Sequence, residues 1–162
     1  MNIFVLDQDP DIAAAHHCDK HVVKMLLETV QLLSTARLAH GADAPYRSTH
    51  KKHPCSIWVA QSRENYAWLV ALGLGLDREY TLRFGKRHLS GLRLQEILTP
   101  PAGMPSLGLT PFAQAMPDAY KRPGDAIEAY RTYYINDKAR FAAWGRSGKT
   151  PDWWPSAVSA AA

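Results

Sequence analysis

The chain of 162 residues has only two cysteines, Cys18 and Cys55, and no long apolar run. Two cysteines are too few for the disulfide framework that holds small secreted domains together. A membrane-spanning helix needs about 20 consecutive apolar residues, and no stretch of this chain approaches that length. The first ten residues, MNIFVLDQDP, also lack the basic start and apolar run of a signal peptide. We therefore expect a cytoplasmic protein with no membrane partner.

The composition is close to that of an average globular protein. Hydrophobic residues make up 46% of the chain and charged residues 21%, which excludes a mainly disordered or fibrous protein. The length fits one domain, which we expect to act as a monomer or a small homo-oligomer. There are 19 Lys and Arg residues against 15 Asp and Glu, a net charge of +4 that is compatible with a polyanionic partner such as a nucleic acid or a nucleotide.

The positions of glycine and proline predict a mostly α-helical fold. Asp9 and Pro10 fit the start of a helix that follows a short extended segment, residues 2–6. No glycine or proline then occurs from Asp11 to about His40, so a long first helix of roughly 45 Å is predicted.

The rest of the chain predicts shorter elements. They are a polar loop over 41–54, one interrupted or two successive helices ending at Gly85, a short helix over 88–98, a loop rich in proline and glycine up to 124, and a helix over 125–144. We expect a single compact helical domain, residues 1–146, with the extended segment packed across its long first helix. Residues 147–162 are expected to form a flexible tail that displays Trp153 and Trp154.

An acidic residue interrupts the apolar stripe of the predicted long helix. At 100° per residue the stripe covers an arc of about 100° and contains Ile12, Ala15, Val22, Val23, Leu26, Val30 and Leu33. The opposite face is polar and contains His17, Lys20, His21, Lys24, Glu28 and Gln31, and His16 lies at the boundary. Asp19 falls in the middle of the apolar arc, where an unpaired carboxylate costs several kcal/mol. Asp19 therefore either faces a working cleft or pairs with a basic side chain such as Arg37 or Arg131 or accepts backbone hydrogen bonds.

Basic residues gather at two places beside aromatic rings. Histidine and lysine dominate the first, RSTHKKH at 47–53, and the second is RFGKRH at 83–88. Such clusters can hold phosphates while nearby rings stack on bases; as an alternative they are solvated loop ends. The candidate nucleic-acid-binding residues are Lys20, Lys24, Arg47, His50, Lys51, Lys52, His53 and Arg83.

Familiar nucleophile and phosphate-binding motifs are absent from the sequence. There is no GxSxG, no GxxxxGK[ST], and no GxGxxG after a strand. Cys18 has titratable neighbours, but a cysteine on a helix flank is more often buried and inert. An amine remains as a candidate nucleophile. An α-amino group has a pKa of about 8 and a lysine one of about 10.4, so more of the α-amine is neutral at pH 7. We therefore consider the α-amine at the start of the chain.

A metal site is an alternative chemistry. His17 and His21 are four residues apart, a spacing that zinc enzymes use on one face of a helix. However, Cys18 stands where the HExxH motif has its glutamate, and Lys20 and Lys24 would place ammonium groups beside the ion. We expect no metal and no other cofactor, and keep a metal-dependent hydrolase, using these two histidines and a loop histidine, as an alternative.

Several segments resemble known families. The opening MNIFVLDQDPDIAAAHHCDKHVVKM, HKKHP at 50–54, REYTLRFG at 78–85 and YRTYY at 130–134 resemble pyrimidine dimer DNA glycosylases of the endonuclease V type, which occur in phages and bacteria. The blocks CDKHVVKM, HP and PFAQAMPDAY also resemble a family of phage proteins without an assigned activity.

The resemblance to the glycosylases implies a helical fold in which the N-terminal amine attacks the sugar C1′ of damaged DNA and a glutamate assists. A Schiff base then forms, and β-elimination cuts the strand. His16 matches a histidine of the family's first helix, and Lys20 with Lys24 reproduces the spacing of two arginines there. His21 stands at the position of the family's glutamate, which leaves Asp19 and Glu28 as the carboxylates.

Either Met1 or Asn2 would supply the amine, because the bulk of Asn2 disfavours removal of Met1. The catalytic candidates are thus Met1, Asn2, His16, Asp19 and Glu28. If Asp19 is the reacting carboxylate, Asp19→Asn abolishes activity and leaves the fold intact. A protein that sequesters a nucleotide or a nucleic acid without reaction is the remaining alternative.

Overall fold

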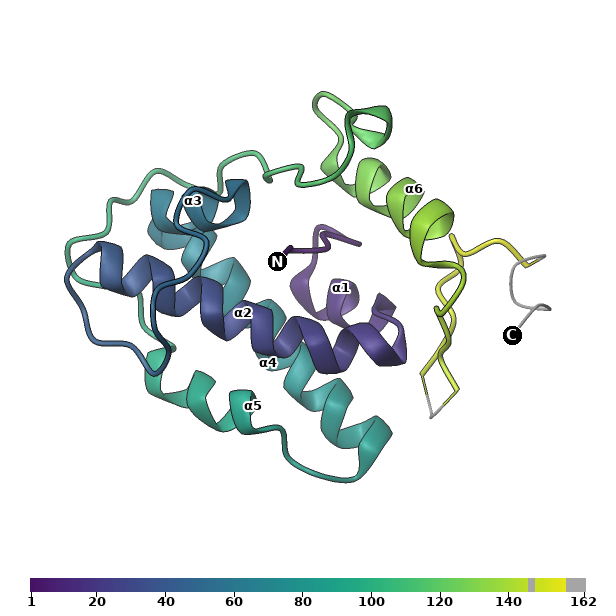
Figure 1. Cartoon of the computed structure of the whole chain (residues 1–162), viewed down its shortest axis with the longest axis horizontal. Coiled ribbons are helices and arrows are strands. Elements are labelled where there is room, and N and C mark those ends of the chain that lie inside the picture. Colours follow the sequence, from purple (N-terminus) through teal and green to yellow (C-terminus); the bar gives the residue numbers. More distant parts are fainter. Residues whose placement is uncertain (146–147, 157–162) are drawn as a thin grey trace.

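The computed structural model describes residues 1–145 and 148–156, which form six α-helices and two 3-10 turns (Figure 1). The helices are α1 (Pro10–His16), α2 (Asp19–Ala39), α3 (Pro54–Gln61), α4 (Arg63–Phe84), α5 (Leu89–Leu94) and α6 (Ala126–Lys138), and the turns are Gln95–Ile97 and Asp118–Tyr120. No strand occurs in these residues, so the mostly α-helical class is confirmed. None of the helices in the described part of the chain combines the length and apolar character needed to cross a bilayer.

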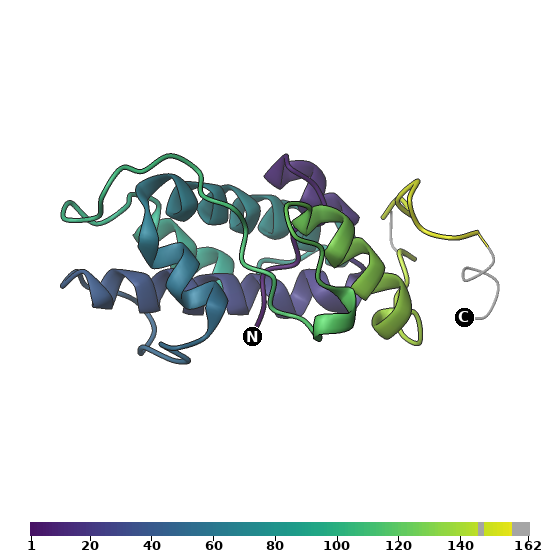
Figure 2. The same ribbon diagram turned by 90° about the horizontal axis from the view of Figure 1, so that it is seen from above.

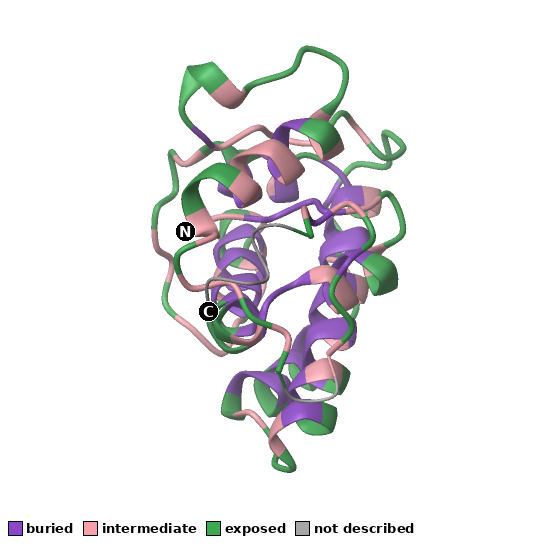
Figure 3. Ribbon diagram, turned by 90° about the vertical axis from the view of Figure 1, so that its right-hand side faces the viewer, coloured by how far each residue is buried: buried purple, intermediate pink, exposed green. Residues whose placement is uncertain are grey.

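The core forms where α2 packs against α4. Leu26 and Leu33 of α2 and Leu69 and Leu76 of α4 are fully buried, and burial of each such side chain contributes about 1.5–3 kcal/mol. Helices α1, α3 and α5 pack around this pair, while α6 lies apart from them near the start of the chain (Figures 1 and 2). Figure 3 shows the buried surfaces of the helices facing one another and the exposed residues on the outer turns.

The first six residues join α6 to this core. Residues 3–6 are buried, at 4% exposure or less, and precede the first helix as the sequence predicted. The Phe4 ring stacks on His21 of α2, at 4.7 Å between ring centroids, and meets Tyr134 of α6 edge-on at 5.3 Å. Arg131 of α6 donates from Nε to the Leu6 carbonyl at 2.9 Å. These contacts of residues 3–6 therefore determine the position of Met1 and Asn2.

The predicted continuous helix over 11–40 is wrong, because the chain breaks between α1 and α2. His17 and Cys18 adopt extended backbone angles, ψ 134° and 161°. The backbone groups that the break leaves without helical partners find tertiary ones: Arg83 of α4 donates to the His17 carbonyl at 2.7 Å, and the Cys18 N–H donates to the Tyr134 hydroxyl at 3.0 Å. A helix break is tolerated when such partners satisfy the freed groups.

The break also changes which residues face the core. Ile12 and Val23, which we placed in the apolar stripe, are 47% and 37% exposed. His17, His21 and Glu28, which we placed on the polar face, are buried. The single periodicity assumed over both segments was therefore wrong, because the two helices have independent orientations.

The two tryptophans near the end of the chain pack on the domain and are not displayed as expected. Trp154 is 5% exposed and lies edge-on to Trp144, at 5.0 Å between ring centroids. Trp153 is half-buried, and its indole N–H donates to Nδ1 of His16 at 3.1 Å. Residues 146–147 and 157–162 of the segment predicted as a flexible tail lie outside the described residues.

The other boundaries agree with the sequence, except that α6 ends at Lys138 and not at 144. Asp9, Ser62 and Asp125 cap α1, α4 and α6 by accepting hydrogen bonds from first-turn N–H groups. Gly85 ends α4 in the left-handed conformation, at φ 67°.

Candidate active site

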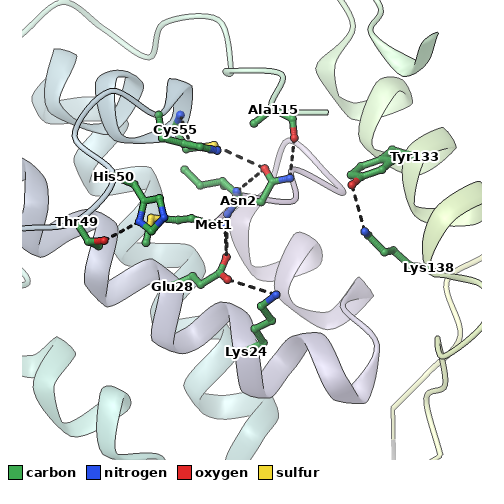
Figure 4. A network of polar contacts seen from close by, with 12 residues as sticks. Met1, Asn2, Lys24, Glu28, Thr49, His50, Cys55, Ala115, Tyr133 and Lys138 are labelled. Carbon is green, nitrogen blue, oxygen red and sulfur yellow. Dashed lines mark hydrogen bonds and ion pairs between the residues drawn. The ribbon is translucent and has the colours of Figure 1, made fainter. Parts of the chain in front are cut away.

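The start of the chain lies against the carboxylate of Glu28. The Asn2 N–H donates to Glu28 Oε2 at 2.8 Å, and the Met1 α-amine lies 3.8 Å from the same oxygen (Figure 4). Glu28 belongs to α2 and is 8% exposed, so little water reaches its carboxylate. An amine and a carboxylate from distant parts of the sequence are thereby brought together.

The amine is the accessible part of Met1. The side chain of Met1 is only 4% exposed, whereas the residue as a whole is half-buried. The exposed area therefore belongs mainly to the backbone, where the α-amine is. On the other side of the carboxylate, Lys24 Nζ lies 3.6 Å from Glu28 Oε1. Each carboxylate oxygen of Glu28 thus faces a basic nitrogen.

The side chain of Asn2 anchors the amine. Its Nδ2 donates to the Ala115 carbonyl at 2.9 Å, and its Oδ1 accepts from the Ile3 N–H at 2.8 Å and from the Tyr130 hydroxyl at 3.0 Å. The Cys55 thiol also points to Oδ1, at 3.7 Å. With both ends of its amide held, Asn2 fixes the backbone to which Met1 is attached.

Tyr130 connects this anchor to the loop between α5 and α6. Its hydroxyl lies 2.7 Å from the Ala113 carbonyl and accepts a hydrogen bond from the Ala115 N–H at 3.1 Å. Burial raises the pKa of Tyr130 well above its usual range, so the hydroxyl stays protonated and can donate. Burial likewise raises the pKa of the Cys55 thiol to about 11, so this cysteine is not a thiolate nucleophile at neutral pH.

Two histidines of the loop before α3 lie near the amine. Burial, followed by the positive charges of the α-amine and His50, lowers the pKa of His53. His50 has φ 48°, a left-handed conformation unusual for a residue other than glycine. Its Nδ1 lies 2.6 Å from the Thr49 hydroxyl (Figure 4). Strained residues of this kind cluster at functional sites.

Lys138 at the end of α6 adds a cation that we did not identify from the sequence. Its ammonium lies 4.5 Å from the centre of the Tyr133 ring and 3.2 Å from the Tyr133 hydroxyl (Figure 4). Burial alone would lower the pKa of Lys138, but hydrogen bonds with Asp137 and Tyr133 raise it. The resemblance of YRTYY drew attention to this helix, yet nothing in the spacing placed its lysine near the start of the chain.

Asp19 lies away from this site and has a structural partner. Its Oδ1 accepts from Arg83 Nη1 at 3.1 Å, and its Oδ2 accepts from the Gly145 N–H at 3.0 Å. It stands nine residues before Glu28, about 13.5 Å along α2. Among the environments that we considered for Asp19, the structure shows pairing with a basic side chain, and the partner is Arg83. Arg37 and Arg131, the partners we expected, bind other groups.

We had expected Arg83 to bind phosphate, but its position in the structure does not allow this. Its side chain is fully buried and also pairs with Glu79 at 2.6 Å. Its Nη2 donates to the Ala15 carbonyl at 3.0 Å. A guanidinium saturated in this way holds α4 to the α1–α2 junction and has no donor directed to solvent.

His16 also lies apart from the amine. Its Nδ1 accepts from the Trp153 indole, and its carbonyl accepts from the Trp144 indole at 3.1 Å. Burial lowers its pKa. The structure thus brings together Met1, Asn2 and Glu28 from the five catalytic candidates.

The remaining basic candidates are accessible. Exposed side chains belong to Lys20, Lys24, Arg47, His50, Lys51 and Lys52, and His53 is half-buried. Lys20 lies 5.4 Å from the centre of the Phe141 ring, and Arg140 lies at the same distance from it. The accessible Lys20 and Lys24 lie on α2, which carries Glu28, and Lys51 and Lys52 lie in the loop that carries His50 and His53.

The two histidines proposed for a metal are packed in the core. His17 donates from Nδ1 to the Ala13 carbonyl at 2.7 Å, and the His21 ring stacks on Phe4. Burial lowers the pKa of His17 to about 4 and that of His21 to about 3. Within residues 1–145 and 148–156, no three His, Cys, Asp or Glu side chains are arranged to hold a metal ion.

Comparisons of the chain with known protein families, with curated proteins and with solved structures find no match.

Proposed function

We propose that this chain is a DNA-processing enzyme of the base-lesion glycosylase and abasic-site lyase type, with the Met1 α-amine as nucleophile and Glu28 as the assisting carboxylate. The observation that supports this proposal is the 3.8 Å contact between an accessible α-amine and a nearly buried carboxylate. It agrees with the chemistry that the sequence resemblance implies, with Glu28 in place of the family's own glutamate.

The proposed reaction needs an amine in its neutral form. Glu28 Oε2 forms an ion pair with the α-amine at 3.8 Å, and a shift of about 0.6 Å would bring the two atoms within the reach of direct proton transfer. The neutral nitrogen attacks C1′ of the damaged nucleotide, the bond from C1′ to the base breaks, and the base leaves with its bonding electrons. The base takes up the proton that Glu28 had accepted, which leaves Glu28 ionised again. Opening of the sugar ring then gives an imine between Met1 and C1′.

Strand cleavage follows from the imine. Removal of a proton from C2′ by a carboxylate pushes electrons toward C3′, and the C3′–O bond breaks with the phosphate as leaving group. Glu28 can take this second proton, because it remains beside the nitrogen that carries C1′. Water finally hydrolyses the imine and returns the free amine.

The accessible lysines support a polyanionic substrate. Lys24 is paired with Glu28 but 65% exposed, so its ammonium can also meet a phosphate at the edge of the site. Lys20 lies one turn before it on α2, and Lys51 and Lys52 belong to the loop that carries His50 and His53. These side chains would position a DNA backbone across the amine.

Borohydride trapping tests the proposal. Borohydride reduces an imine to a stable secondary amine, so wild-type protein mixed with DNA that contains an abasic site should form a covalent adduct. The same chain with a chemically acetylated N-terminus, and Glu28→Gln, should form little or none. DNA binding without any adduct in the wild type would reject the lyase and favour the sequestering alternative; cleavage abolished by a chelator would favour the metal-dependent hydrolase.

A further inference from the structure

His53 lies beside the amine site, at the end of the loop that leads into α3. It is half-buried. The charges of the Met1 α-amine and of Glu28 both act on its imidazole, so the ring is close to the two groups that we assign to the reaction. The proposed steps use Met1 and Glu28 and leave this imidazole without a role.

One hydrogen bond determines the tautomer of His53. Its Nδ1 accepts from the Cys55 N–H at 3.2 Å and thereby caps the first turn of α3. A ring nitrogen that accepts a hydrogen bond carries no proton, so in the neutral ring the proton is on Nε2. Burial, followed by the positive charge of the α-amine, lowers the pKa of His53, which keeps the ring neutral at pH 7.

The Nε2–H group of His53 is a free donor that solvent can reach. Within residues 1–145 and 148–156, Nδ1 makes the one hydrogen bond of this side chain. Nε2 has no partner there, yet it is not one of the nitrogens that are buried without a hydrogen bond, as His17 Nε2 and His21 Nδ1 are. It therefore lies at the surface of the protein, where an oxygen atom of a substrate can accept from it.

Imine formation at C1′ needs such a donor. When the nitrogen lone pair forms the second bond to C1′, an oxygen leaves C1′ with the electrons of its bond. In a nucleotide this oxygen is O4′, which takes up one proton from the nitrogen through Glu28. In an abasic site it is the aldehyde oxygen, which takes up two and leaves as water. The imine that remains is protonated, and a neutral N–H directed at the oxygen stabilises its developing negative charge without losing a proton.

We propose that His53 is a catalytic residue that donates a hydrogen bond from Nε2 to the oxygen that leaves C1′, while Nδ1 is held by the first turn of α3. This proposal rests on the function proposed for the Met1 amine. It assigns the attack to Met1, the movement of protons to Glu28 and the stabilisation of the leaving oxygen to His53.

Two substitutions separate the donor from the helix cap. His53→Asn keeps an acceptor at the place of Nδ1 and still caps α3, but it has no donor at the place of Nε2. His53→Gln keeps an N–H near the place of Nε2 and is the poorer cap. In single-turnover borohydride trapping on duplex DNA with one abasic site, His53→Asn should form the adduct about 100-fold more slowly than the wild type. Its Kd for this DNA and its melting temperature should be unchanged. His53→Gln should recover most of the rate and melt at a lower temperature.

His88→Asn is the matched control and should react at the wild-type rate. His88 is also half-buried and caps α5 in the same way, since its Nδ1 accepts from the Ser90 N–H at 3.0 Å, but its ring meets Tyr80. A wild-type rate in His53→Asn overturns the proposal. So does a slow His53→Gln beside a normal His53→Asn, which is the order that a purely structural cap predicts. If the wild type itself forms no adduct, the proposed function falls, and the role of His53 falls with it.

Discussion

The α-amine of Met1 and the carboxylate of Glu28 form an ion pair, with 3.8 Å between the nitrogen and Oε2. This relationship arises because residues 3–6 are buried against α2 and α6 and return the start of the chain to the middle of α2. An amine held beside a nearly buried carboxylate is what imine chemistry requires, and the function that we propose depends on it.

Glu28→Gln should lower the rate of strand cleavage at an abasic site by at least about 100-fold, since the amide cannot accept the protons that the reaction releases. The Asn2 N–H can still donate to the side-chain oxygen of the introduced amide, so the melting temperature should change little. Single-turnover cleavage measures the rate, and Glu96→Gln, at an exposed position paired with Arg93, is the control. A wild-type rate in Glu28→Gln would remove this carboxylate from the mechanism.

Tyr130→Phe should loosen the start of the chain without touching the reacting groups. The variant loses the contacts of the hydroxyl with Asn2, Ala113 and Ala115. We expect about tenfold slower adduct formation with the pH dependence unchanged, because orientation and not proton transfer is affected. Tyr120→Phe, at a half-buried tyrosine beside Tyr133, is the control. Equal adduct rates in Tyr130→Phe and the wild type would show that the anchor is unimportant for reaction.

Asp19→Asn should reduce stability and leave adduct formation intact, which reverses the expectation from the sequence. Removal of its buried partner by Arg83→Ala should have a larger effect, about 3–5 kcal/mol in the free energy of unfolding, because two carboxylates and two carbonyls lose their donor. Urea unfolding measures both variants against Arg78→Ala, an exposed arginine paired with Asp11. If Asp19→Asn is fully stable but inactive, the assignment of the carboxylate to Glu28 is wrong.

The break between α1 and α2 shows which features of the fold and of the site could be predicted from the sequence. Helix content, the loops and the cap at Gly85 follow from local signals and were predicted. The break at His17 and Cys18 has no glycine or proline, and depends on Arg83 and Tyr134, which are 66 and 116 residues away in the chain. Without the break, Asp19 falls in an apolar stripe and Glu28 on a polar face, so the sequence directed most attention to Asp19, which the structure pairs with Arg83.

Stability should fall as the pH falls below about 6.5. Burial first, and then nearby positive groups such as Arg83 for His17 and Lys138 for His21, lowers the pKa of these histidines to about 4 and about 3. Between these values and 6.5 the unfolded chain binds protons that the folded protein does not, so the free energy of unfolding decreases with falling pH. The slope is about 1.4 kcal/mol per pH unit for each histidine.

Urea unfolding at pH 7.5, 6 and 5 measures this dependence. His21→Phe retains a ring to stack on Phe4 and to meet Phe141 edge-on, and should reduce the slope. His50→Gln, which replaces an exposed histidine, should leave the slope unchanged. A slope in His21→Phe equal to that of the wild type would mean that His21 is not buried in its neutral form.

Binding to DNA should weaken steeply with salt. Lys52→Gln and Lys24→Gln should each reduce the slope of log K against log salt by about 1, because one phosphate contact is lost. Lys121→Gln is the control, since Lys121 is paired with Asp118 and is not among the proposed phosphate contacts. Fluorescence anisotropy at several salt concentrations measures the slope, and equal slopes for all three variants would argue against a phosphate path beside the amine.

Peptide mapping of the borohydride-reduced adduct tests the proposed function most directly. Proteolysis and mass spectrometry should place the sugar remnant on the α-nitrogen of Met1. A remnant on the side chain of Lys20, Lys24 or Lys138 would contradict the role given to the start of the chain, even if the protein cleaves abasic DNA.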